Sequence, residues 1–288
     1  MNKNKNVFVL TMEHNEDYFL PIFLRHYSQF FEPKNIFVID HGSNSNLIPQ
    51  EFNRIYLPRD KPFSETVRLN FIKDIAHGLL RYYDAGIYVD CDELIYLNDF
   101  NFDVLKTSSP IYLAGFECTV AQVSGEKKLI GILNPHEFKP LIFKGVPDWI
   151  GGFHSAKNAE PSDFLSIPMV HLKFFSQKQF ELRGESRKNT YKEMVADERD
   201  MGIDHHWADS DGDSLDFYNK INDEIKKNSP INKFSPILSG AHFKKLEPHK
   251  TLYVQSEFIY IPQGTSREQH GLVDLSNLFP DLLNTPEG

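Results

Sequence analysis

The amino-acid sequence predicts an α/β fold with a mixed, mostly parallel sheet flanked by helices. Short apolar runs alternate with helical patterns over about the first 100 residues, and polar, turn-forming residues follow the runs. A short, continuous apolar run is typical of a strand buried on both faces, and strands that alternate with helices indicate parallel βαβ units. The runs lie at residues 7–10, 36–39, 54–57 and 87–89. Because ligands of such sheets collect at the carboxyl ends of the strands, we expect a functional site just after these runs.

Two helices are predicted between these strands. Apolar residues lie on one side of segment 19–30 at the spacing of an amphipathic helix. Ser64 is a suitable N-cap for the second helix. From Val67 to Leu79, apolar residues recur at roughly helical spacing.

Beyond residue 100 the pattern changes. Residues 111–116, 138–143 and 167–175 are predicted strands, and residues 176–200 are a predicted helix. Pro140 is expected to place its strand at an edge of the sheet, because proline has no backbone N–H to donate. The remaining residues indicate no clear topology.

Charge and composition restrict the classes of partner. The 31 basic and 40 acidic residues give a net charge of −9, which argues against duplex nucleic acid because phosphate binding favours a basic face. Cys91 and Cys118 form no CxxC pair, which favours a reducing, cytoplasmic setting. No apolar segment has the character of a signal peptide or the length of a membrane span. We therefore expect a cytoplasmic protein, with peripheral contact at the inner face of the membrane left open.

The run at residues 87–89 leads directly into Asp90, Cys91, Asp92 and Glu93. Burying such carboxylates without partners is unfavourable. A hard cation would neutralise them, and oxygen ligands suit Mg²⁺ or Mn²⁺. The alternative is that the acids are solvated loop residues or helix N-caps, since short acidic patterns are common. The preceding strand and the three strand–loop units before it favour the metal site.

Three segments resemble those of GT-A-fold glycosyltransferases, and the bacterial family-2-like branch in particular. They are the loop Thr-Met-Glu-His-Asn-Glu at 11–16, the strand end Val-Ile-Asp-His-Gly-Ser-Asn at 38–44, and the turn Tyr-Val-Asp-Cys-Asp-Glu at 88–93. The resemblance covers about the first 175 residues. It implies a Rossmann-like nucleotide-diphospho-sugar transferase fold, with a catalytic domain at 1–175. Residues 176–288 would form an extension on the acceptor side, packed on the same domain.

The resemblance also assigns residues to the donor. It implies that Asp40 contacts the nucleobase and that Glu13 and Asn15 line the nucleotide site. Asp90 and Asp92 would bind the ribose and the metal–diphosphate, both as metal ligands, with Asp92 favoured as the direct one. A UDP-sugar is the favoured donor.

A further metal ligand and two phosphate-binding residues are expected elsewhere in the chain. His171 is the first choice for the ligand, and His154 beside a Gly-Gly pair is the competitor. A core histidine bonded to a backbone carbonyl is the alternative interpretation of His171. Lys173, two residues further on the same strand face, would meet a donor phosphate. Arg68 would do the same from the start of its helix, or would simply be a solvated charge.

Transfer with inversion, which the resemblance favours, needs a general base across the cleft from the metal. Asp148, next to Trp149, and Glu117, after the strand at 111–116, are the two candidates. Either residue could instead be an ordinary surface acid.

The expected activity is metal-dependent transfer of a sugar from a nucleotide-sugar to a hydroxyl of a glycan or lipid-linked glycan. By resemblance, the pathway would be capsule or lipopolysaccharide assembly. Two alternatives remain open. One is a nucleotidyltransferase or another nucleotide-sugar-processing enzyme, although residues 11–16 contain no glycine for a phosphate loop. The other is a non-catalytic glycan-binding protein on the same fold.

Overall fold

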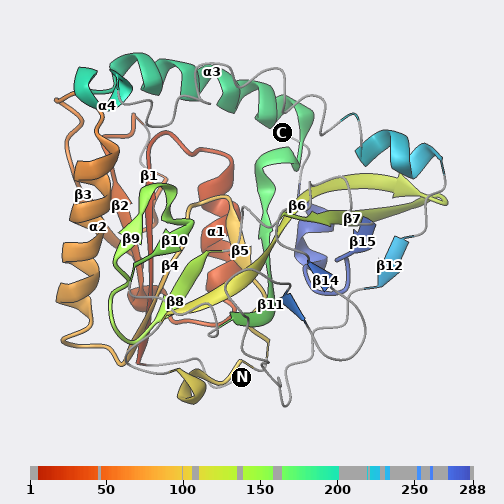
Figure 1. The fold of residues 1–288 in the computed structure, drawn as a ribbon, viewed down its shortest axis with the longest axis horizontal. Coiled ribbons are helices and arrows are strands. Elements are labelled where there is room, and N and C mark those ends of the chain that lie inside the picture. The colour runs from red at the N-terminus through yellow and green to blue at the C-terminus, as the bar shows by residue number, and fades with distance from the viewer. Residues whose placement is uncertain are drawn as a thin grey trace.

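The computed structural model (Figure 1) describes most of the chain up to residue 200 and parts of the remainder. The described residues are 6–44, 47–98, 100–105, 110–134, 139–157, 164–200, 219, 221–227, 231–233, 252–253, 260–261 and 272–285. Within them the fold is α/β, with a mixed sheet flanked by helices, as the sequence predicts.

The first half of the chain builds the parallel part of the sheet. Its strands are β1 (Val7–Glu13), β2 (Ile36–Asp40), β3 (Asn53–Tyr56), β4 (Ala85–Tyr88) and β5 (Glu93–Ile95). Its longer helices are α1 (Phe19–Tyr27) and α2 (Glu65–Leu79). The order β4-β1-β2-β3 is parallel throughout, so the carboxyl ends of these strands meet at one edge. Each predicted strand and helix of this half is present within a few residues of its expected position.

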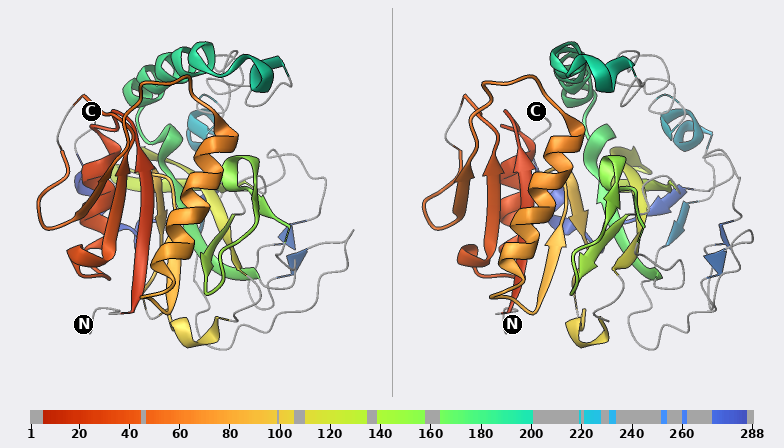
Figure 2. Two further views of the ribbon diagram at one scale, coloured as in Figure 1. Left: turned by 90° about the vertical axis from the view of Figure 1, so that its left-hand side faces the viewer. Right: turned by 60° about the vertical axis from the view of Figure 1, so that its left-hand side comes forward.

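Strand β1 is buried on both faces because each face is covered by a helix. Val7 and Val9 belong to the core that contains the apolar residues of α1. Phe8 and Leu10 belong to a second core, with the apolar residues of α2. Successive side chains of a strand alternate between faces, so a continuous apolar run is what two covered faces require. Figure 2 shows α1 and α2 on opposite sides of the sheet.

The second half extends the sheet mainly by antiparallel pairing. Its strands are β6 (Ile111–Val123), β7 (Glu126–Leu133), β8 (Pro140–Phe143), β11 (Phe164–His171), β12 (Ile231–Lys233) and β15 (Leu272–Asp274). The sheet order is β12-β15-β7-β6-β8-β4-β1-β2-β3, and β11 joins β6 to β5. A tight turn at Ser124 and Gly125, both with positive φ, connects β6 to β7. Because β15 pairs with β7, part of the C-terminal extension shares the sheet of the first domain.

Two details of the predicted strands are wrong. Pro140 does not mark an edge, because β8 lies between β4 and β6; a register irregularity beside Pro140 accommodates the missing N–H. The last predicted strand ends at His171, and Lys173 lies in a 3₁₀ turn, η5 (Leu172–Phe174). Lys173 therefore does not share a strand face with His171.

Helices α3 (Gln177–Glu193) and α4 (Ala196–Asp200) run across the carboxyl edge of the sheet (Figure 1). The far end of α3 is attached beside α2: Phe63 N donates to Glu193 O, and Val195 N donates to Phe63 O. From α4, the Glu198 carboxylate accepts hydrogen bonds from the backbone N–H groups of Glu65 and Thr66. It therefore satisfies N–H groups at the start of α2 that have no partner within the helix. Helices α3 and α4 thus form a bridge over the carboxyl edge of the sheet, where ligands of parallel sheets bind.

Replacing Glu198 with alanine is expected to destabilise the protein by about 1–2 kcal/mol, because buried N–H groups of α2 lose their acceptor. Urea unfolding monitored by circular dichroism measures this change. Glu198→Gln, which keeps an acceptor oxygen, should recover part of the loss. An alanine variant as stable as the wild type would show that the bridge adds nothing to the stability of α2.

Among the described residues, no helix combines the length and the apolar character needed to cross a membrane. Cys91 and Cys118 are both buried and carry free thiols.

Candidate functional site

A pocket of about 800 Å³ lies at the carboxyl edge of the parallel strands, beneath α3. Its walls come from the loop after β1, the turn after β4, the start of α2, the turn at 152–154 and one face of α3. The volume falls in the range of small-molecule and cofactor sites. Six lysine or arginine side chains line the pocket: Arg59, Arg68, Lys139, Lys173, Arg183 and Arg187.

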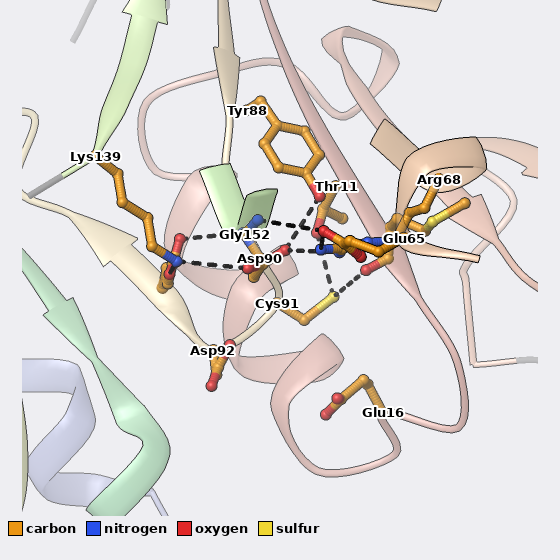
Figure 3. Close-up of polar contacts among 12 residues, drawn as sticks. Thr11, Glu16, Glu65, Arg68, Tyr88, Asp90, Cys91, Asp92, Lys139 and Gly152 are labelled. Atoms are coloured by element: carbon orange, nitrogen blue, oxygen red, sulfur yellow. Dashed lines mark hydrogen bonds and ion pairs between the residues drawn. The ribbon is translucent and has the colours of Figure 1, made fainter. Parts of the chain in front are cut away.

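The two aspartates of the Asp-Cys-Asp turn face different partners. Asp90 accepts a hydrogen bond from the Tyr88 hydroxyl at 3.1 Å, and its carboxylate lies 3.7 Å from both Lys139 Nζ and Arg68 Nη1. Burial alone would raise the pKa of Asp90, but Lys139 and Arg68 bring it below its ordinary value. Figure 3 shows Asp90 joined to these residues, with Asp92 set apart from them. The two aspartates therefore belong to two separate clusters of side chains, and the one that contains Asp90 is the Lys139 cluster.

The residue between the aspartates anchors the turn. Cys91 is 2% exposed, and its Sγ lies 3.3 Å from Thr11 Oγ1 on β1. The next acid, Glu93, is also buried and pairs with Lys139. Burial raises the pKa of Glu93 despite the opposing effect of Lys139. One buried lysine thus holds Asp90 and Glu93 at the base of the pocket.

Asp92 is 2% exposed and forms the second cluster. Its Oδ2 lies 3.0 Å from His171 Nε2 and accepts a hydrogen bond from Arg183 Nη1. Arg183 also donates from Nη2 to Glu16 at 2.8 Å. Burial would raise the pKa of Asp92, but Arg183 and His171 hold it well below its ordinary value. Asp92 is therefore an ionised carboxylate at the pocket wall.

Glu117 lies behind His171. Strands β6 and β11 run parallel with Glu117 opposite His171, and Glu117 Oε2 is 3.4 Å from His171 Nδ1. Glu117 is completely buried, does not line the pocket, and also accepts a hydrogen bond from Asn134 Nδ2. Its burial places Glu117 out of reach of an acceptor hydroxyl in this structure, so the geometry does not support the predicted role as the catalytic base. Its position suits it to orient the imidazole.

The chemistry of these donors fits part of a divalent-cation site. A carboxylate and an imidazole converge, and a second carboxylate stands behind the imidazole, as around many bound metals. Within the part of the chain that the structure describes, no group of three or more His, Cys, Asp or Glu side chains could hold a metal ion. Asp92 and His171 would thus supply two ligands for Mn²⁺ or Mg²⁺, and water or phosphate oxygens would supply the others.

The other expected ligands lie apart from this pair. Asp90 belongs to the Lys139 cluster, as described above. His154 lines the pocket with an exposed side chain that packs against Gly152, in the turn that contacts α2. The single site expected from Asp90, Asp92 and a histidine is therefore not assembled as predicted.

Arg68 and Lys173 both line the pocket, as expected for phosphate-binding residues. Arg68 donates two hydrogen bonds to Glu65, at 2.7 and 2.8 Å, and its guanidinium lies over the Phe153 ring. With 17% of its side chain exposed, it is not a solvated surface charge. The Lys173 ammonium lies over the Phe174 ring, 5.1 Å from the centroid.

The residues expected to bind the nucleoside have different positions. Glu13 and Asn15 line the pocket, but they also connect the loops after β1 and β2. Ser43 Oγ donates to Glu13 at 2.7 Å, and Asn44 N donates to Asn15 Oδ1 at 2.8 Å. Asn15 has a φ of 55°, a conformation that asparagine tolerates better than most residues. The two loops therefore form one preorganised wall.

Asp40 does not line the pocket, so the geometry does not support its predicted role at the nucleobase. It is 1% exposed and accepts hydrogen bonds from Arg54 and from Ser43 N. Strands β2 and β3 are parallel neighbours, which brings Arg54 beside Asp40. Asp40 fixes the turn after β2 instead of meeting a ligand.

Asp148 is not placed to act as the base either. It forms an ion pair with Lys73 of α2 at 2.7 Å, and its side chain is 48% exposed. It does not line the pocket. The hydrogen bond from Lys73 lowers the pKa of Asp148. It is an ordinary surface acid, which was the alternative considered from the sequence.

Sequence reasoning missed the contribution of α3. Polar side chains at three- and four-residue intervals line the pocket along one face of this helix: Gln179, Arg183, Ser186, Arg187 and Thr190. Phe180 and Gly184 form its buried side. The interval between Arg183 and Arg187 places two guanidinium groups on one face, and that interval was the available signal.

No protein-family model matches the chain. No curated protein is significantly similar to it.

Proposed function

We propose that this protein is a GT-A-like glycosyltransferase that uses a divalent cation and a nucleotide-sugar donor. The observation that carries the proposal is the alignment of Glu117, His171 and Asp92, which ends at the wall of a pocket lined by six basic and six acidic side chains. A nucleoside diphosphate bound together with a divalent cation brings both signs of charge, which suits a pocket whose lining also carries both. The resemblance of the loops after β1, β2 and β4 to this class supports the same conclusion.

Each cluster has a role in this proposal. When bound, a cation at Asp92 and His171 would act as a Lewis acid toward the leaving diphosphate. Glu117 Oε2 lies 3.4 Å from His171 Nδ1 and is not hydrogen-bonded to it; it would orient the imidazole when a cation binds at Nε2. Arg68 and Lys173 face the pocket as cations for the phosphates, and Asp90 keeps Arg68 and Lys139 in place. The preorganised loops at Glu13 and Asn15 shape the nucleoside end.

The acceptor is proposed to be a hydroxyl of a glycan or lipid-linked glycan, and the protein to act in the cytoplasm or at the inner face of the membrane. Helix α3 forms part of the pocket wall, which gives the extension a place beside the donor. A UDP-sugar remains the favoured donor class.

Calorimetric titration with UDP, GDP and CMP, each with and without Mn²⁺, tests the proposal. We expect one nucleotide diphosphate, UDP in the first place, to bind with Mn²⁺ and much more weakly without it. Failure of all three nucleotides to bind in the presence of Mn²⁺ would contradict the proposed function.

A further inference from the structure

Arg183 of α3 is the counter-charge of Asp92. Its Nη1 donates to Asp92 Oδ2, its Nη2 donates to Glu16, and its guanidinium lies 4.7 Å from the centroid of the Phe19 ring. The Arg183 side chain is 19% exposed and that of Asp92 is 3% exposed. The arginine is thus a fitted part of the pocket wall and not a loose surface charge.

The atom that Arg183 contacts is the one that a cation would need. Asp92 Oδ2 accepts from Arg183 and also lies 3.0 Å from His171 Nε2, the second donor of the proposed cation site. A divalent cation at this oxygen would lie close to the guanidinium. Two positive charges repel strongly where solvent is largely excluded. Arg183 and the cation therefore compete for Asp92.

Arg187, one turn further along α3, is a second positive charge in the same wall. Burial and the neighbouring Arg183 both lower the pKa of Arg187, which reflects the proximity of two like charges. An anion between two guanidinium groups relieves their repulsion and can accept hydrogen bonds from both. A diphosphate in the pocket is an anion of this kind.

We propose that Arg183 couples cation binding to diphosphate binding by exchanging Asp92 for the phosphates. Without a nucleotide, Arg183 neutralises Asp92 and weakens the binding of a cation. When a diphosphate binds, Arg183 and Arg187 turn toward it, and Asp92 becomes available to the cation. Each ligand then raises the affinity of the other by the same factor. This inference rests on the proposed function.

The exchange needs only a change of side-chain conformation. The ends of α3 are fixed by the Ser176 cap and by the backbone contacts of Phe63 with Glu193 and Val195. Glu16 already binds the second nitrogen of Arg183 and can remain its partner when the guanidinium leaves Asp92. When Arg183 leaves, Asp92 keeps its contact with His171 until the cation binds.

Direct titration with Mn²⁺ alone, followed by electron paramagnetic resonance of the free ion, tests the competition. Arg183→Met is expected to raise the affinity for Mn²⁺ by about tenfold or more, because a contacting charge is removed from a buried carboxylate. Arg187→Met removes the same charge one turn away, without a contact to Asp92. It should change the affinity by less than about threefold. Arg183→Lys, which keeps the charge, should bind Mn²⁺ about as weakly as the wild type.

A second titration measures the coupling. In the wild type, saturating UDP is expected to raise the affinity for Mn²⁺, and in Arg183→Met this effect should be largely lost. The inference is overturned if Arg183→Met does not bind Mn²⁺ more tightly than the wild type, or if Arg187→Met gains as much. Thermal unfolding of each variant establishes that it is folded. Failure of the proposed function would appear separately, as absent nucleotide binding, because the titration with Mn²⁺ alone requires no nucleotide.

Discussion

Replacing Asp92 with asparagine is expected to lower kcat/KM for sugar transfer by about 10³-fold, because the developing charge on the leaving diphosphate loses its cation. Asparagine has nearly the same volume, and Arg183 keeps Glu16 as a partner, so the fold should be retained. Initial rates over a range of donor concentrations, at saturating Mn²⁺, measure the effect.

Asp148→Asn is the matched control for this prediction. It makes the same chemical change in an acid that is half exposed and lies outside the pocket. We expect its rates to stay within about twofold of the wild type, since a single surface ion pair contributes little. Equal losses in the two variants, or a fully active Asp92→Asn, would contradict the assignment of Asp92 to the metal.

Replacing Lys139 with methionine is expected to lower the free energy of unfolding by about 3–5 kcal/mol. Lys139 is 3% exposed and pairs with Glu93, which is 1% exposed. Its removal leaves the Glu93 carboxylate buried without its cation. Urea unfolding at neutral pH, followed by tryptophan fluorescence, measures the loss.

The pH dependence of this variant has a defined sign. The pKa of Glu93 in the folded protein already lies above its ordinary value of 4.5 because of burial, and loss of Lys139 removes a group that lowers it. The folded state then binds a proton more tightly than the unfolded state, so stability falls as the pH rises above about 4.5. The deficit of Lys139→Met should therefore shrink as the pH is lowered toward that value.

A double variant separates the charge from the packing. Lys139→Met with Glu93→Leu replaces the pair by apolar groups and should recover most of the lost stability. Lys128→Met, at a partly exposed lysine paired with Asp274, should cost less than about 1 kcal/mol. A loss of similar size in Lys139→Met and Lys128→Met would show that the buried pairing is unimportant.

The features predicted correctly from sequence are those set by local patterns. The apolar runs of β1 and β2 and the Ser64 cap of α2 depend on neighbouring residues alone, and Ser64 Oγ does accept from Val67 N. The expectation that His171 lies beside Asp92 agrees with a separation of 3.0 Å. Asp92 and His171 meet because β5, which follows the turn, pairs with β11, which ends at His171.

The features that were missed depend on contacts between distant segments. Asp40 was expected to contact the nucleobase, but a parallel neighbouring strand supplies Arg54 as its partner. Glu117 follows a predicted strand, and only the pairing of β6 with β11 shows that it faces His171. Arg183 belongs to a predicted helix in which no site residue was named. A charge pattern alone does not reveal which partner neutralises each charge.

The central claim is that this pocket activates a nucleotide-sugar, and release of the nucleotide from a donor panel tests it most directly. Wild type and Asp92→Asn would be incubated with UDP-, GDP- and CMP-sugars, with Mn²⁺ or with a chelator, and the freed nucleotide would be measured. We predict release from one donor class, with UDP-sugars first, that requires Mn²⁺ and is lost in Asp92→Asn. Release that is equally fast in Asp92→Asn, or no release from any donor together with no nucleotide binding, would contradict the claim.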